Sequence, residues 1–268
     1  KYGSVIKGML HNNNENRQDS GARYSQFLSF KNGMGTLINA LKQSLEGCIS
    51  LNEAVTQISR NEESWEIQTE RRTIEASGVI VTTPSYHTAS LTQNFDTELA
   101  SELTSIEYAS SSVVIFAYKT KEISHELNGF GFVVPDVEKS DLIACSFSSI
   151  KFDGRAPEDH ILIRAFLGGA LNPEILNLDD NQIIDRAKNE LEKILGIKGN
   201  PKFTLIQRYP DAMPQYHLGH LDKVANIQNR LLEYKGLEIA GNAYSGVGIP
   251  ECVYSGEQAA ENILKVLF

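Results

Sequence analysis

The sequence predicts an α+β fold, and three observations support this prediction. Strand-like segments follow one another between residues 111 and 169 without a helix between them, an order typical of a mixed or antiparallel sheet. The segment 78–83, GVIVTT, holds three consecutive β-branched residues, which suits a strand covered on both faces. Residues 181–196, NQIIDRAKNELEKILG, repeat apolar side chains at helical spacing.

The elements of the first third follow from local patterns. Residues 9–23 are polar, with three consecutive asparagines, and predict a mobile loop. Residues 31–47 predict a helix, because leucine and isoleucine recur three and four residues apart and Gly47 is placed to end it. The segments EAVTQISR, SWEIQTE and RRTIEA, between residues 53 and 76, predict three strands, of which the second alternates apolar and polar residues.

The remaining elements are justified in the same way. Residues 90–110 predict helix and loop. Asp179, with Gln182 three residues later, forms a capping box for the helix at 181–196, and Gly196 is placed to end it. Further elements follow in order: strand FTLIQRYP, a polar helix at 221–234, strand LEIAG, a glycine-rich turn and a final helix.

Composition narrows the classes of function. The chain has 268 residues and a formal charge of −9, which argues against a general nucleic-acid or anionic-membrane surface. Its three cysteines form no CxxC pair, which suits a reducing compartment and offers no metal or disulfide framework. There is no signal peptide and no apolar run of ~18–20 residues, so we expect a cytoplasmic location. Because Lys1 is not a natural start, we also expect a fragment of a longer protein.

The strand, turn and helix at 237–268 carry most chemical content. Gly241, Gly246 and Gly248 remove side chains from the turn, so backbone can approach a ligand. The helix start has free N–H groups and about half a positive charge, which favours a phosphate or the N1–C2=O edge of a reduced flavin. A plain docking helix after a glycine-rich loop is the alternative. The chain contains no GxGxxG fingerprint.

These residues resemble a known family. The segment GNAYSGVGIPECVYSGEQAA is similar to the C-terminal flavin segment of protoporphyrinogen/coproporphyrinogen oxidases, within the flavin-containing amine oxidase superfamily. Other stretches agree in order: KNGMGTLINAL, EAVTQISR, GVIVTTP, GFGFVVP, FSSIKFDGRAP and RYPDAMPQYHLGH. The resemblance is greatest to heme-synthesis enzymes of Gram-positive type, and it covers their C-terminal part without the N-terminal GxGxxG region.

The resemblance implies a domain organisation. It implies an incomplete α/β FAD-binding part of amine oxidase type (p-hydroxybenzoate-hydroxylase-like), formed by residues 24–90 and 235–268. Residues 91–234 would form a mixed-sheet substrate domain, and residues 1–23 a loop or linker.

The resemblance also implies a cofactor site. Val55 would contact the adenine end of FAD through its backbone, and Tyr209 would lie near the isoalloxazine. The glycine-rich turn, with Gly241, Val247, Gly248 and Ile249, would meet the flavin.

For the substrate, the resemblance implies that Phe147 stacks on the tetrapyrrole and that Val133 covers its other side. Phe147 could instead be a core residue. Arg164 lies in an apolar strand and needs a partner. A nearby carboxylate is the ordinary choice, and our hypothesis is a substrate propionate. Lys151, Arg155 and Arg208 are weaker candidates of the same kind.

The implied function is FAD-dependent oxidation of coproporphyrinogen III to coproporphyrin III, or of protoporphyrinogen IX to protoporphyrin IX, with molecular oxygen as acceptor. The cofactor carries the chemistry, so no catalytic side chain is nominated. His217 and His220 lack a nearby third ligand, so no metal site is expected. Alternatives are a carotenoid desaturase-like enzyme and a non-catalytic tetrapyrrole-binding module. A peripheral membrane contact through the missing region and the oligomeric state stay open. We do not expect this chain alone to retain FAD.

Overall fold

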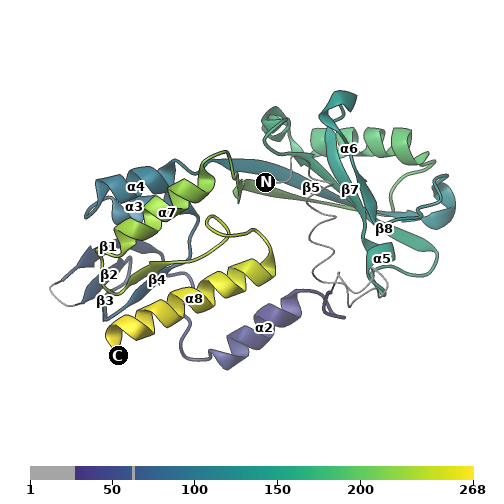
Figure 1. Cartoon of the computed structure of the whole chain (residues 1–268). Helices are drawn as coiled ribbons and strands as arrows, with labels where there is room; N and C mark the ends of the chain where they lie inside the picture. Colours follow the sequence, from purple (N-terminus) through teal and green to yellow (C-terminus); the bar gives the residue numbers. More distant parts are fainter. Residues whose placement is uncertain (1–27, 62–63) are drawn as a thin grey trace, which may run out of the picture.

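A five-stranded antiparallel sheet forms one half of the protein (Figure 1). The computed structural model describes residues 28–61 and 64–268. The strand order in this sheet is β6-β7-β8-β5-β9. The strands are β5 (Tyr108–Lys119), β6 (Gly131–Val133), β7 (Leu142–Phe147), β8 (His160–Gly168) and β9 (Phe203–Pro214). The predicted succession of strands is therefore confirmed, and every pairing is antiparallel.

Helix α6 (Asp180–Leu195) packs on one face of this sheet. Its apolar stripe is buried against the inward side chains of β5 and β8. The predicted capping box is present, because the Gln182 backbone N–H donates to Asp179 Oδ1 at 2.9 Å and the Asp179 N–H donates to Gln182 Oε1 at 3.1 Å. Gly196 ends the helix in the left-handed conformation, at φ +62°, which costs glycine little.

A second hydrophobic core lies in the other half of the molecule. It is surrounded by a three-stranded antiparallel sheet of β1 (Val55–Arg60), β2 (Trp65–Thr69) and β3 (Thr73–Ala76), and by the parallel pair β4 (Val79–Val81) and β10 (Leu237–Ile239). Helices α3 (Ser85–Thr92), α4 (Thr97–Thr104) and α7 (His220–Leu231) complete it. Trp65, which is 1% exposed, contributes the largest fully buried side chain.

A buried ion pair ties α4 to α7. Asp96 accepts hydrogen bonds from the Glu98 and Leu99 N–H groups at the start of α4. Its carboxylate, whose side chain is 2% exposed, also accepts from Arg230 at 2.7 and 3.0 Å. Burial by itself raises the pKa of Asp96, but the hydrogen bonds from Arg230 and its other donors hold the pKa below its ordinary value.

Strand β4 differs from its prediction. We expected cover on both faces, yet Ile80 is 36% exposed while Val81 is buried. The physical reason is that β4 pairs only with β10 in a two-stranded sheet, and the described residues leave one of its faces open.

Two helices expose their apolar side chains. None of the residues of α2 (Gly35–Ser44) is buried, and α8 (Ile249–Leu267) buries only Ala259. The prediction for α2 is confirmed, although it ends before Gly47. Helix α8 lies along β10 and β4. No helix among the described residues is long and apolar enough to cross a membrane.

Short elements link the strands. These are η2 (Thr120–Glu122), η3 (Asp136–Glu138), α5 (Ser148–Lys151) and η4 (Pro173–Asn177). The loop predicted at 9–23 lies outside the described residues. The domain boundaries implied by the resemblance stay predictions.

Candidate functional site: a glycine-rich turn and an open sheet face

The turn between β10 and α8 follows the carboxyl end of a parallel strand. Strands β4 and β10 run side by side, so their carboxyl ends meet at one edge, where α/β proteins commonly bind ligands. The Gly241 N–H donates to Ser255 Oγ at 3.1 Å, and the Tyr216 hydroxyl donates to the Asn242 carbonyl. Helix α8 and the segment before α7 therefore both hold this turn.

The amino end of α8 has no side-chain cap. Gly248 is its N-cap residue and makes no side-chain cap hydrogen bond. Pro250 has no N–H, and the Glu251 carboxylate lies beside the helix start, because a Cβ at Gly248 would lie 2.1 Å from Glu251 Oε2. A Cβ at Gly246 would lie 2.6 Å from Glu251 Cγ and 2.7 Å from Glu251 Cβ, so the turn passes close to the helix only because this residue is glycine. Val247 and Ile249 flank the helix start, and their side chains are 60% and 53% exposed.

This arrangement suits the group that the resemblance implies. Unfilled N–H groups at a helix start favour negative charge, and exposed aliphatic side chains favour a flat apolar ring. Val247 and Ile249 offer the exposed aliphatic surface, while the Glu251 carboxylate lies at the helix start. The roles of Gly241, Val247, Gly248 and Ile249 toward FAD stay predictions.

The other two expected cofactor residues lie on separate elements. Val55 is the first residue of β1 and is 40% exposed. Tyr209 lies on β9 and is 42% exposed. Each is therefore accessible to a ligand, and their roles toward FAD stay predictions.

The histidines expected to be structural lie beside the turn. The Tyr216 ring stacks on the His220 ring, with centroids 4.1 Å apart and planes 13° apart. Burial lowers the pKa of His220, which is 7% exposed. His217 Nε2 lies 3.2 Å from Glu107 Oε2. Within the part of the chain that the structure describes, no group of three or more His, Cys, Asp or Glu residues could hold a metal ion.

The sheet face opposite α6 is open, and its register gathers most of the expected substrate residues. Val133 pairs with Ala144, and Ala144 pairs with Phe166, which lies two residues from Arg164 on the same strand face. Because directly paired residues share a face, Val133 and Arg164 lie on the same side. Arg164 pairs with Ile115 of β5. Ser111, four residues before Ile115 and on the same face of β5, pairs with Tyr209. The open face therefore carries Val133, Arg164 and Tyr209.

Arg164 has no ionic partner among the described residues. Its side chain is exposed, and its guanidinium lies 5.2 Å from the Phe166 ring centroid. The ordinary expectation of a nearby carboxylate is thus not met in the described residues. The guanidinium remains able to bind an anion from outside.

Phe147 lies on the other face of the sheet. It pairs with Ile163, which is fully buried, and is itself 2% exposed. Its ring centroid lies 6.2 Å from that of Phe132, within the core under α6. This packing supports the alternative that Phe147 is a core residue, and its stacking role stays a prediction.

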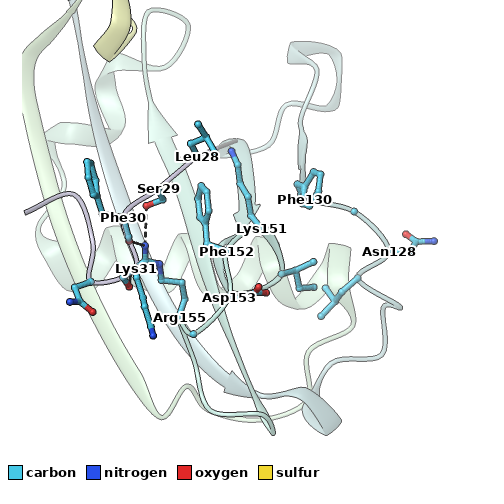
Figure 2. Close-up of a pocket in the computed structure, with 15 residues that line it drawn as sticks. Leu28, Ser29, Phe30, Lys31, Asn128, Phe130, Lys151, Phe152, Asp153 and Arg155 are labelled. Atoms are coloured by element: carbon cyan, nitrogen blue, oxygen red, sulfur yellow. Dashed lines mark hydrogen bonds between the residues drawn. The ribbon is translucent and has the colours of Figure 1, made fainter. Parts of the chain in front are cut away.

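The weaker cationic candidates make interactions within the chain. Arg208 donates to Asp180 Oδ1 at 2.8 Å and to the Leu176 and Leu178 carbonyls at 2.8 and 2.6 Å. It therefore anchors the start of α6. Arg155 donates to Ser29 Oγ and the Phe30 carbonyl at 2.9 and 2.7 Å. Arg155 and Lys151 line a cavity of about 1130 Å³ (Figure 2).

Several open-face residues were not singled out from the sequence. Phe203 and Leu205 of β9 are 51% and 48% exposed. Tyr216 lies beyond β9 and holds the glycine-rich turn, and the sequence did not single it out either. The alternation of apolar residues in FTLIQRYP could have indicated that Phe203 and Leu205 share one face of the strand. It did not say which face would be covered.

Comparisons with known proteins agree on one family. The flavin containing amine oxidoreductase family matches residues 5–264. Coproporphyrinogen III oxidase of Staphylococcus aureus is 30% identical over 99% of this chain and 59% of its own length. The Bacillus subtilis coproporphyrinogen III oxidase is 29% identical over 100% of this chain and 58% of its own length. The chain thus spans somewhat more than half the length of these relatives.

Solved structures show the same fold. A proposed protoporphyrinogen oxidase from Exiguobacterium sp. 255-15 superposes with a TM-score of 0.83 at 30% identity, over 98% of this chain and 55% of that one. Reduced UDP-galactopyranose mutase has a TM-score of 0.69 at 15% identity, over 88% of this chain and 51% of that one. The second likeness concerns the fold alone.

Proposed function

Because this chain belongs to the flavin containing amine oxidoreductase family, we propose that it serves the FAD-dependent oxidation of coproporphyrinogen III to coproporphyrin III. Molecular oxygen would be the final acceptor, and the reaction would belong to heme biosynthesis. The observation that carries this proposal is the open sheet face. Arg164 lies there among apolar side chains, and it has no ionic partner in the described part of the chain. A large apolar ring that bears carboxylates matches that face.

The chain's own residues have limited tasks in this reaction. A bound flavin would accept one hydride from a carbon bridge in each of three two-electron rounds, with oxygen reoxidising it between rounds, and the proton lost in each round would pass to water. The N–H groups at the start of α8 would hold the flavin edge, and Val247 and Ile249 would exclude water beside it. Arg164 binds a propionate and so orients the macrocycle. No proton-transfer side chain is required of this chain.

The same cation supports a substrate that bears carboxylates, and the similarity to relatives supports coproporphyrinogen III among such substrates. Coproporphyrinogen III oxidases are among the relatives at 29–30% identity, and protoporphyrinogen oxidase of tobacco chloroplasts is 26% identical over 88% of this chain. Both substrates bear carboxylates, and protoporphyrinogen IX is the alternative. A hydrocarbon substrate, as in a carotenoid desaturase, would leave Arg164 without a role.

We also propose a cytoplasmic location, where the three free cysteines would stay reduced. The cofactor is proposed to be FAD. The 268-residue chain alone is proposed not to retain it, because the sequence contains no GxGxxG segment for the pyrophosphate.

The test is turnover by the complete gene product. Each porphyrinogen is supplied separately, product fluorescence is followed in air, and flavin absorbance is followed under anaerobic conditions. We expect flavin bleaching and a fluorescent product, faster with coproporphyrinogen III. Binding of porphyrin without flavin bleaching or oxygen uptake would instead identify a non-catalytic tetrapyrrole-binding module and refute the proposal.

A further inference from the structure

The two hydrophobic cores are joined by a ribbon of two strands. Strand β5 begins at Tyr108, which packs against the core of α3, α4 and α7, and it enters the core under α6 at Val114 (Figure 1). Strand β9 pairs with β5 and lies at the edge of the sheet. The glycine-rich turn belongs to the first core through Ala243 and Tyr244, whereas the open face belongs to the sheet. The ribbon therefore sets how the turn and the open face lie relative to each other.

A bulge interrupts this ribbon. One residue of β5, Ser110, lies opposite three residues of β9, at positions 210–212. The flanking pairs are Ala109 with Met213 and Ser111 with Tyr209. A bulge bends a strand pair and redirects its side chains, and bulges are frequent beside active sites. The bend lies next to Tyr209, the residue of β9 that we expect near the flavin.

Asp211 in the bulge has a left-handed backbone, at φ +43°. Aspartate tolerates this conformation better than most residues, and the surrounding structure must hold it there. The Ser110 hydroxyl donates to Asp211 Oδ1 at 2.9 Å, and the Asp211 N–H donates to Ser110 Oγ at 2.8 Å. The Asp211 carbonyl accepts from the Tyr86 hydroxyl at 3.2 Å. Asp211 is thus bonded to β5 and to α3 at the same time.

Tyr86 connects this bulge to the edge that carries the glycine-rich turn. It is the second residue of α3, which follows the carboxyl end of β4, and β4 runs parallel to β10. The Tyr86 and Tyr108 rings meet edge to face, with centroids 5.0 Å apart, and the Ser85 N–H donates to the Tyr108 hydroxyl oxygen at 2.9 Å. The Tyr86–Asp211 hydrogen bond therefore links that edge to the end of the open sheet face.

We propose that Asp211 is a positioning residue, which fixes the angle between the two halves so that a substrate on the open face meets a flavin at the glycine-rich turn. The inference rests on the proposed function. Reacting atoms must approach to ~3–3.5 Å, and a displacement of ~1 Å can cost roughly a hundredfold in rate. Because Arg164 and its sheet would still bind the substrate, a change at Asp211 affects kcat and leaves KM nearly unchanged.

The variants separate the two bonds of Asp211. Asp211→Ala removes the carboxylate and disfavours the left-handed backbone, whereas Asp211→Asn keeps an oxygen acceptor and tolerates that backbone. Tyr86→Phe removes only the hydroxyl that links the two halves. Asp185→Ala is the control, because Asp185 is an exposed aspartate of α6, on the covered side of the sheet. Urea unfolding shows that each variant of the complete gene product is folded.

The first readout needs no turnover. Spin labels on cysteines placed at Ser101 of α4 and Asn181 of α6, two exposed positions in different halves, report the distance between the halves by pulsed EPR. The accessible native cysteines are replaced by serine. We expect Asp211→Ala and Tyr86→Phe to shift or broaden the distance distribution, Asp211→Asn to restore it, and Asp185→Ala to leave it unchanged.

The second readout is the rate of porphyrinogen oxidation. We expect Asp211→Ala to lower kcat at least about tenfold with KM within about twofold, Tyr86→Phe to act in the same direction, and Asp211→Asn to recover most of the rate. An unchanged distance distribution in Asp211→Ala and Tyr86→Phe, or a raised KM with the wild-type kcat, would overturn the inference and leave the proposed function standing. If Asp211→Ala does not fold, Tyr86→Phe decides by the same criteria. A wild-type protein that oxidises neither porphyrinogen would overturn the proposed function and the role of Asp211 in it.

Discussion

Replacing Arg164 with leucine separates a binding role from a structural one. The side chain is exposed, and its one aromatic contact lies 5.2 Å from the Phe166 ring centroid. An exposed cation–π contact contributes about 0.5–1 kcal/mol. Leucine is apolar, like the neighbouring Ile115 and Phe166. We therefore expect the free energy of unfolding to change by no more than about 1 kcal/mol.

The effect on the substrate should be much larger. A hydrogen bond to a charged group contributes about 1.5–3 kcal/mol, which corresponds to a factor of roughly 10 to 150 in affinity. In the complete gene product, Arg164→Leu should raise the KM for coproporphyrinogen III at least about tenfold. The kcat should change less, because Arg164 orients the ring and takes no part in the electron transfer. Product fluorescence gives both constants, and urea unfolding gives the stability.

A matched control lies on the other side of the sheet. Arg186 of α6 is 48% exposed and lies 3.3 Å from Asp141, so Arg186→Leu also removes a surface arginine. It should leave the KM unchanged. If Arg164→Leu keeps the wild-type KM and loses more than about 2 kcal/mol of stability, the cation is structural and the reasoning is refuted.

Three further outcomes follow from the structure. Asp96→Asn should lower the free energy of unfolding by about 3 kcal/mol, because it breaks a buried pair with Arg230. The pKa of Asp96 is depressed in the folded state, so its contribution to the free energy of unfolding is complete above pH ~4 and declines at lower pH. Urea titrations at pH 7 and pH 3 should therefore show a smaller effect of the mutation at pH 3. An equal effect at both pH values contradicts the assignment. Gly131→Ala should lower the thermal midpoint by several degrees, because a Cβ there would lie 2.0 Å from the Cys145 carbonyl oxygen at φ +141°. Gly129→Ala, with no atom within 4 Å of the added Cβ, should not, and equal midpoints would count against this close approach. The purified 268-residue chain should show no flavin absorbance near 450 nm, and stoichiometric flavin would contradict the need for a separate pyrophosphate site.

Local signals allowed most elements to be predicted. The helix at 180–195 carries its own capping box and terminal glycine, and both were found as expected. These features depend on residues three or four apart, so they can be recognised without knowledge of the fold. The sequence could not show whether both faces of β4 are buried, because the exposure of Ile80 depends on which distant segments pack against it.

The candidate site was predictable only in part, for the same reason. The glycine-rich turn at 241–248 could be identified because its glycines and the following helix are contiguous. Arg164 and Phe147 both lie in apolar strands. The residues next to them in the sequence do not indicate which of the two side chains points to solvent. The pairing of Phe147 with Ile163 sends one ring into the core, and a slip of one residue would exchange the faces.

The amino-acid sequence by itself determined the type of most elements, the acidic character of the chain and the family resemblance, since these depend on neighbouring residues and composition. Tertiary structure alone decided that Val133, Arg164 and Tyr209 share the open face, and that residues near positions 30, 130 and 150 enclose one positively charged cavity. The physical reason is that strand register and long-range packing bring together side chains that are more than a hundred positions apart. Short-range periodicity carries no information on that proximity.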